Sequence, residues 1–157
     1  MMVLDPRRPA SFLNVVREYA RGAKPPSSEP ARVLVVDDEE AIRKFVTRVL
    51  SDAGYRTVVA ASGPEAITIA AGADAFDLIV TDLMMPEMTG DELARRLRQN
   101  EPALKVLYLT GFSDRLFKEK VTLWEDEAFL DKPCSVKSLR EAVSLLLYGR
   151  LEVTQAP

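Results

Sequence analysis

Histidine is absent from this chain, and cysteine occurs once, at Cys134. These absences exclude a Ser-His-Asp triad, a histidine-ligated zinc site, a phosphohistidine and an internal disulfide within the 157 residues. An excess of cations is also lacking, since 21 Lys and Arg stand against 24 Asp and Glu and the net charge is −3. That balance argues against direct binding of nucleic acid, which depends on clustered cations.

Long hydrophobic runs are missing too. The runs at 33–36 and 145–147 are far shorter than the roughly 18 residues of a membrane helix. Asp5, Arg7 and Arg8 occupy the N-terminal stretch where a signal peptide needs an apolar segment. We therefore expect a cytoplasmic protein without a membrane partner. A hydrophobic content of 47% is enough for one packed domain of about 100–200 residues.

The first 30 residues differ in composition from the rest. They hold five cations and three anions, a net charge of +2, which leaves −5 for the remainder. Apolar residues recur at helical spacing from Phe12 to Ala20 and predict a short amphipathic helix. Three prolines in 22–30 predict a linker. The resulting division is an N-terminal extension at 1–21, a linker at 22–30, a main domain at 31–149 and a tail at 150–157.

Within the main domain, short apolar runs alternate with stripes of helical period. The runs predict strands at 33–36, 55–60, 78–81, 106–109 and 128–131. The first helical stripe covers 42–50 and stops at Gly54, and the last covers 139–147 and stops at Gly149. Three further helices are predicted to begin at Ser62, Thr89 and Ser113. This alternation predicts an α/β fold with a doubly wound, five-stranded parallel sheet.

Ligands of such sheets bind beyond the carboxyl ends of the strands. The polar residues at those positions are Asp37, Asp38, Asp82, Thr110 and Lys132. Carboxylates 4 Å apart repel by about 4 kcal/mol at an effective dielectric of 20, so an acidic cluster here needs a cation. Oxygen ligands favour Mg²⁺, and a facing lysine and hydroxyl would hold a phosphoryl group. The pattern predicts phosphoryl transfer with a carboxylate as nucleophile.

Four motifs in order closely resemble the receiver domain of response regulators. They are VLVVDDE at 33–39, DLMMPEMTG at 82–90, LTG at 109–111 and KP at 132–133. The resemblance spans about residues 31–148 and implies a flavodoxin-like (βα)5 fold. It also implies a Mg²⁺-dependent signalling domain, rather than a turnover enzyme, that is phosphorylated by a sensor histidine kinase or a histidine phosphotransfer protein.

The resemblance also implies a role for each site residue. Mg²⁺ would be held by Asp37, Asp38, Asp82 and the backbone carbonyl of Met84. Asp82 would be the phospho-acceptor, while Lys132 and Thr110 would bind the phosphoryl group. Thr110 and Phe129 would form the switch that reshapes the face built from the fourth helix, fifth strand and fifth helix. A downstream target protein would dock on that face, through a population shift caused by the added negative charge.

Some residues depart from the family pattern. Met84 and Phe112 are bulky and apolar at positions that govern water access to the acyl phosphate in this family, which predicts slow self-hydrolysis. Cys134 stands where many relatives carry phenylalanine, and we interpret it as a packing change. Trp124 and the acidic residues 125–127 replace a glycine-containing turn before the fifth strand, at the edge of the partner face.

Residues 150–157 are too few for an output domain, so a single-domain response regulator is the leading expectation. A related alternative is a receiver of the kind attached to hybrid kinases, acting as a sink or adaptor. A phosphorylation-independent scaffold would share the fold. A Mg²⁺-dependent aspartyl-phosphate hydrolase would carry Asp-x-Asp after the first strand, whereas Asp37 and Asp38 are adjacent. The N-terminal helix would either cover an apolar patch of the domain or mask or dimerise its output face.

Overall fold

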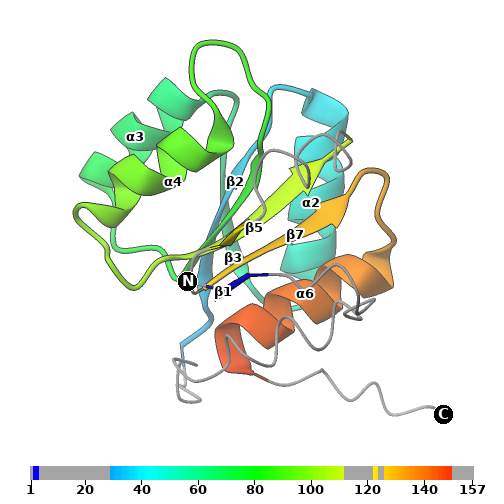
Figure 1. Ribbon diagram of the computed structural model, residues 1–157. Coiled ribbons are helices and arrows are strands. Elements are labelled where there is room, and N and C mark those ends of the chain that lie inside the picture. The colour runs from blue at the N-terminus through cyan, green and yellow to red at the C-terminus, as the bar shows by residue number, and fades with distance from the viewer. Residues whose placement is uncertain (1, 4–28, 112–121, 124–125, 150–157) are drawn as a thin grey trace, which may run out of the picture.

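The computed structural model describes residues 2–3, 29–111, 122–123 and 126–149. Its centre is a five-stranded parallel sheet in the order β3-β2-β4-β5-β7, with helices on both faces (Figure 1). The strands are β2 (Arg32–Val36), β3 (Arg56–Ala60), β4 (Leu78–Asp82), β5 (Lys105–Thr110) and β7 (Glu127–Asp131). The helices in the described residues are α2 (Glu40–Asp52), α3 (Gly63–Gly72), α4 (Gly90–Arg98) and α6 (Val136–Tyr148). The predicted doubly wound α/β fold is confirmed.

The strands differ in burial according to their place in the sheet. Every residue of β4 and β5 is buried, because helices cover both faces of these inner strands. The edge strand β3 is mostly half-buried or exposed, which accounts for its mixed composition. Tyr55 was predicted as strand but precedes β3, because its amide donates to the carbonyl of Leu50 at 3.0 Å and closes the end of α2.

Local signals in the sequence fix the helix ends. The Ser62 hydroxyl accepts a hydrogen bond from the Glu65 amide at 3.2 Å, and the Ser135 hydroxyl accepts one from the Ser138 amide at 3.0 Å. Helix α6 ends at Gly149, whose φ of 68° lies in the left-handed region that favours glycine. These caps set where α3 and α6 begin and where α6 stops.

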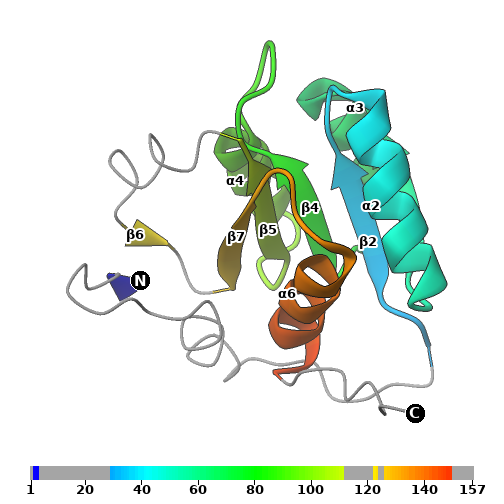
Figure 2. The same cartoon turned by 90° about the vertical axis from the view of Figure 1, so that its right-hand side faces the viewer.

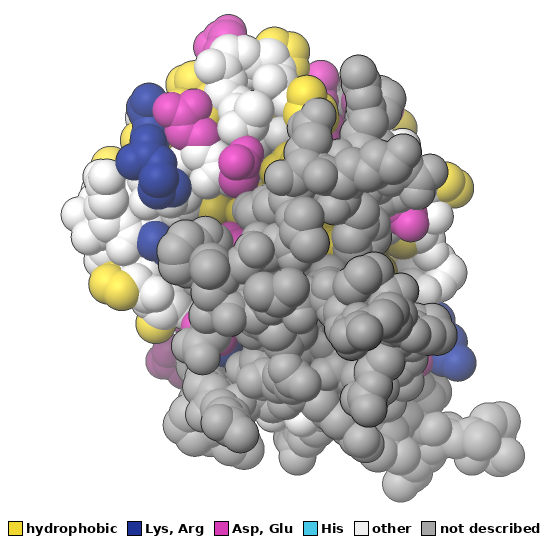
Figure 3. Space-filling view, viewed as in Figure 1, with side chains coloured by type: hydrophobic (Ala, Val, Ile, Leu, Met, Phe, Trp, Pro, Cys, Tyr) yellow, Lys and Arg dark blue, Asp and Glu magenta, His cyan; other side chains and the backbone are white. Residues whose placement is uncertain are grey.

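Helix α4 distributes its charges along its axis. Its first turn holds acidic residues and its last turn holds arginines, which suits the helix dipole. Basic and acidic side chains lie next to each other over the helices at the left of Figure 3. On α4, Arg96 donates to Glu92 at 3.0 Å, four residues earlier. Such an exposed pair contributes only about 0.3–0.5 kcal/mol, so the buried face of α4 provides most of its attachment to the sheet.

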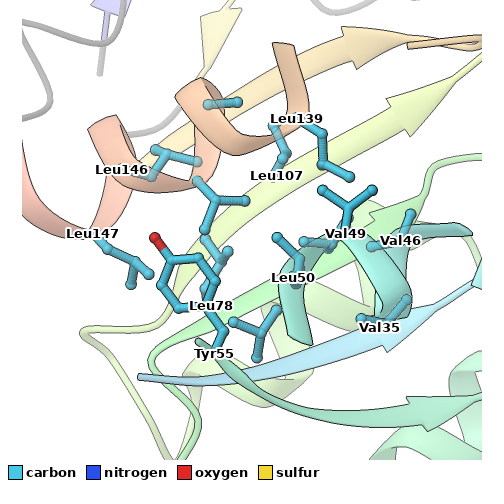
Figure 4. Close-up of a cluster of buried hydrophobic side chains, with 14 of the residues drawn as sticks. Val35, Val46, Val49, Leu50, Tyr55, Leu78, Leu107, Leu139, Leu146 and Leu147 are labelled. Carbon is cyan, nitrogen blue, oxygen red and sulfur yellow. The ribbon is translucent and has the colours of Figure 1, made fainter. Parts of the chain in front are cut away.

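Two apolar clusters hold the sheet from opposite sides. Figure 4 shows one of them, where Leu50 from α2 and Leu139 from α6 meet Leu107 of β5. Strand residues alternate between the faces, so Leu34 and Ile79 belong instead to the cluster beneath α3 and α4. Burial of each such side chain contributes about 1.5–3 kcal/mol. The two clusters fix the strands, and with them the carboxyl edge of the sheet.

Several predictions lie outside the described residues: the helix at 12–20, most of the linker, the helix beginning at Ser113, and the tail. Met2–Val3 (β1) and Thr122–Leu123 (β6) form a short antiparallel pair that the sequence did not predict. Figure 2 shows this pair beside the β7 edge of the main sheet. Within the described part of the chain, no helix combines the length and apolar character needed to span a bilayer.

Candidate functional site

The site lies at the point where the order of the strands in the sheet reverses. Strand β2 pairs with β3 on one side and with β4 on the other, so the point between β2 and β4 is the topological switch point. Asp37 directly follows β2, and Asp82 is the last residue of β4. The pairing of Val36 with Thr81 brings both acids to the same edge.

Three carboxylates gather at this edge. Asp37, Asp38 and Asp82 each offer one oxygen, and these oxygens lie within 4.8 Å of one another. Asp37 is 2% exposed and Asp82 is 7% exposed, whereas Asp38 faces solvent. The set therefore combines two buried acidic ligands with an open side.

Lys132 adds a cation to the cluster from the segment after β7. Its Nζ lies 2.7 Å from Asp37 Oδ2 and 3.3 Å from Asp82 Oδ2, and its side chain is 14% exposed. Its backbone amide donates to the carbonyl of Thr110 at 2.9 Å, which ties the segment to the end of β5. The peptide between Lys132 and Pro133 is cis. Residues 95 positions apart thus form one ion-pair network.

The electrostatics leave this network short of positive charge. Burial raises the pKa of Asp82, and the nearby Asp37 charge adds to that rise, although the Lys132 ammonium opposes it. Burial disfavours the charged form of Lys132 and by itself would lower its pKa. The hydrogen bond that Lys132 donates to Asp37 and the charges of the two carboxylates outweigh that effect and raise the pKa of Lys132. One ammonium therefore does not compensate both buried acids, and an oxygen-only site of this kind fits a hard divalent cation such as Mg²⁺.

Backbone groups orient the carboxylates. The amide of Glu39 donates to Asp37 Oδ1 at 2.9 Å, and the amide of Met84 donates to Asp82 Oδ1 at 3.2 Å. Gly90 lies so close to Asp82 that a Cβ at this position would overlap the Asp82 carbonyl oxygen. The glycine of the 82–90 motif is therefore a packing requirement beneath the site.

Thr110 and Phe129 occupy neighbouring strands. Thr110 is buried at the end of β5, one residue beyond Leu109, which pairs with Asp82. Phe129 is half-buried in β7 and packs against the cluster under α3 and α4. Of the predicted site residues, Asp37, Asp38, Asp82 and Lys132 are thus brought together directly. Met84 reaches Asp82 through its amide, and its side chain is 54% exposed.

Two residues near the cluster were missed in the sequence. Arg43 on α2 donates from its guanidinium to the backbone carbonyl of Asp37 at 2.7 Å. Glu39 places Oε1 3.8 Å from Lys132 Nζ. Glu39 was considered as part of the motif at 33–39, and Arg43 was not singled out. The available signal was the position of Arg43 one turn into the helix, on the end that faces the acids.

A buried network near the opposite end of β7 was also missed. Glu127 was predicted within an acidic segment of unassigned form, yet it is the first residue of β7 and 1% exposed. Its Oε2 accepts hydrogen bonds from Tyr108 Oη at 2.8 Å and Arg98 at 3.1 Å. Burial, together with the Glu127 charge, raises the pKa of Tyr108 well above its usual value. A tyrosine in the otherwise aliphatic run at 106–109 was the signal, because its hydroxyl needs a partner.

Known proteins share this fold and sequence pattern. The sensor kinase CckA of Brucella abortus is 38% identical over 122 residues, which are 76% of this chain and 13% of CckA. The response regulator receiver protein CpdR of the same species is 32% identical over 116 residues, 74% of this chain and 96% of CpdR. The chain spans about half of the response regulator MprA of Mycolicibacterium vanbaalenii, at 37% identity. Similarity thus extends to small receivers and to parts of longer proteins.

Solved structures of receiver domains are also similar to this chain, in fold and in sequence. The receiver domain of the hybrid histidine kinase CckA superposes with a TM-score of 0.64 at 32% identity, covering 74% of this chain and 99% of that domain. The response regulator TrrA of Thermotoga maritima, in complex with Mg²⁺ and BeF, gives 0.66 at 32% identity with the same coverage. A sequence model of the response regulator receiver domain matches residues 33–144. The chain belongs to the response regulator receiver domain family.

Proposed function

We propose that this chain accepts a phosphoryl group on Asp82 from a phosphohistidine of a sensor histidine kinase or phosphotransfer protein, in a Mg²⁺-dependent reaction. The observation that carries the proposal is the cluster itself. Asp37, Asp38 and Asp82 offer oxygens within 4.8 Å of one another, and Lys132 Nζ lies within 3.3 Å of both buried acids. The donor histidine lies outside these 157 residues, because none of them is a histidine.

The transfer is a displacement at phosphorus. An Asp82 carboxylate oxygen attacks the phosphoryl group, the phosphorus–nitrogen bond breaks, and the histidine of the donor leaves with the electron pair of that bond. Asp37, Asp38, Asp82 and the Met84 carbonyl would hold Mg²⁺, which supplies positive charge against the transferring oxygens. The Lys132 ammonium and the Thr110 hydroxyl donate to the new phosphoryl oxygens.

Lys132 must change partners during this step. Its ammonium is shared between Asp37 and Asp82 before transfer. The acyl phosphate then carries about −1.5 to −2 charges and offers new acceptor oxygens, which draw the ammonium and the Thr110 hydroxyl. Thr110 is buried and Phe129 lies in the adjacent strand β7, so a movement of Thr110 changes the packing around Phe129.

The output of this switch is a docking face for a target protein. The face comprises the helix predicted from Ser113, strand β7 and helix α6, and phosphorylation biases it toward a conformation with higher target affinity. The match over 96% of CpdR, a response regulator receiver protein, supports a receiver that signals by docking on a target. The match to the CckA receiver supports the alternative, in which it acts as a sink or adaptor.

The intact mass of the protein tests the chemistry. The full chain is incubated with a small acyl-phosphate donor, with and without Mg²⁺, beside Asp82→Ala and the control Asp52→Ala, which removes an exposed acid at the end of α2. We expect one added phosphoryl group in the wild type and in the control, only with Mg²⁺, and none in Asp82→Ala.

The other outcomes identify the competing functions. A wild type that gains no phosphoryl group with Mg²⁺ refutes the proposal and favours a phosphorylation-independent scaffold. Multiple-turnover release of phosphate from a phosphomonoester, dependent on Asp82, would instead favour a hydrolase.

A further inference from the structure

The guanidinium of Arg43 donates to the backbone carbonyl of Asp37 at 2.7 Å. We propose that Arg43 is a positioning residue that fixes the peptide between Asp37 and Asp38 and thereby sets the affinity of the acidic cluster for Mg²⁺. This inference rests on the proposed function, because it concerns the same cluster.

The two acids depend on this peptide to different degrees. The Asp37 carboxylate is held on both oxygens, by the Glu39 amide at 2.9 Å and by Lys132 Nζ at 2.7 Å. Asp38 is exposed, and among the described residues no hydrogen bond or ion pair holds its carboxylate. Its direction therefore follows from the backbone.

The backbone at this point is one planar unit. The Asp37 carbonyl and the Asp38 amide belong to the same peptide plane, so a bond that anchors the carbonyl also orients the Cα of Asp38. The amide of Asp37 donates to the Ala60 carbonyl at 3.3 Å and holds the preceding peptide. Arg43 holds the next peptide, between Asp37 and Asp38, by its hydrogen bond to the Asp37 carbonyl.

Arg43 is itself fixed by the helix that carries it. Its amide donates to the Glu39 carbonyl at 3.1 Å in the first turn of α2, and helical side chains lean back toward the N-terminus, which brings the guanidinium to Asp37. Val46 and Leu50 anchor the next turns of α2 in the core. The donor is thus half-buried and mounted on a rigid element.

The sign of the effect separates positioning from simple electrostatics. A cation beside a metal site repels the metal ion, so removing its charge alone tightens Mg²⁺ binding. Loss of a group that orients a ligand weakens binding, typically 10–100-fold. Arg48 provides the matched control, because it is an exposed arginine on the same helix.

Calorimetric titration of the metal-free full chain with Mg²⁺ tests the inference. We expect Arg43→Met to raise the Kd for Mg²⁺ about 10–100-fold, whereas Arg48→Met stays within about twofold of the wild type. Arg43→Lys keeps the charge and one donor, and we expect it to recover part of the affinity. Saturating Mg²⁺ restores acyl-phosphate labelling of Arg43→Met, which a general loss of folding would not allow.

The same titrations distinguish a failure of this inference from a failure of the proposed function. An unchanged or lower Kd in Arg43→Met and in Arg43→Lys overturns the inference and leaves the proposed function standing. If Arg43→Met does not fold, Arg43→Gln, which is polar but neutral and shorter, takes its place, and a wild-type Kd in that variant refutes the positioning role. A wild-type chain that binds no Mg²⁺ overturns the proposed function and this inference with it.

Discussion

Replacing Lys132 with methionine removes the ammonium that joins Asp37 to Asp82. The Lys132 Nζ lies 2.7 Å from Asp37 Oδ2 and 3.3 Å from Asp82 Oδ2, so this one cation forms an ion pair with each buried acid. Methionine keeps an unbranched apolar stem of similar length, so the packing of the segment after β7 changes little. The variant therefore isolates the electrostatic role of the lysine in the metal-free protein.

The magnitude follows from the separation of the acids. The carboxylate oxygens lie within 4.8 Å of one another, and at that limit two unit charges repel by about 3.5 kcal/mol at an effective dielectric of 20, once no cation lies between them. Breaking a buried ion pair by removing one partner costs about 3–5 kcal/mol, and the partial exposure of Lys132 places it at the lower end. We expect Lys132→Met to lower the metal-free unfolding free energy by about 3 kcal/mol at pH 7.

Urea unfolding with and without Mg²⁺ measures this effect. A divalent cation replaces the missing charge, so saturating Mg²⁺ recovers most of the lost stability in Lys132→Met. The control is Lys137→Met on α6, whose lysine is exposed and 3.9 Å from Glu141. This control is expected to change the unfolding free energy by less than about 0.5 kcal/mol. An equal loss in both Mg²⁺ conditions, or no loss in either, would refute the electrostatic reasoning.

Three further predictions concern the pKa of Asp82, the hydroxyl of Tyr108 and the lifetime of the acyl phosphate. The raised pKa of Asp82 means that the folded protein favours the protonated carboxyl, so the metal-free unfolding free energy falls as pH rises through that pKa. The affinity for Mg²⁺ rises over the same pH range, because the metal binds the ionised carboxylate. Calorimetric titrations at several pH values check this, and an affinity that does not change with pH contradicts it. Tyr108→Phe removes a donor to buried Glu127 and costs about 1–3 kcal/mol at pH 7 by urea unfolding. The raised pKa of Tyr108 stabilises the folded protein, and this stabilisation is lost as pH rises above about 10. In Tyr108→Phe the unfolding free energy therefore falls less steeply with pH in this range, by up to about 1.4 kcal/mol per pH unit. An unchanged slope excludes Tyr108 as the source of the alkaline loss of stability. The phosphorylated wild type decays more slowly than Met84→Asn, Phe112→Glu, since the exposed Met84 side chain shields the acyl phosphate; equal lifetimes of the phosphoprotein count against this role.

Much of the fold was predictable because its signals are local. The helix start at Ser62 and the stop at Gly149 act within four residues of themselves, and the structure confirms both. The cap at Ser135 is equally local, although it was not predicted. The alternation of strands and helices predicted the parallel sheet. That topology in turn predicted that Asp37, Asp82 and Lys132 lie at one edge of the sheet. The boundaries of the extension, linker and tail remain predictions.

Contacts between distant residues were decided only by the tertiary structure. Glu127 is a charged residue in an acidic segment, which by itself predicts exposure. The register of β5 with β7 and the end of α4 instead surround it with Tyr108 and Arg98. Arg43 likewise has the sequence pattern of a surface cation, and only the turn from β2 into α2 brings it to the Asp37 carbonyl.

The physical reason for this division is the range of each interaction. Hydrophobic period, caps and turns depend on neighbours within one or two helical turns, so the sequence by itself determined the elements and the edge where the acids gather. The ammonium of Lys132 reaches Asp37 across 95 residues, and its 2.7 Å contact depends on strand register, loop geometry and the packing of both faces together. Only the folded sheet decides which buried charges meet, because register and packing are properties of the whole domain.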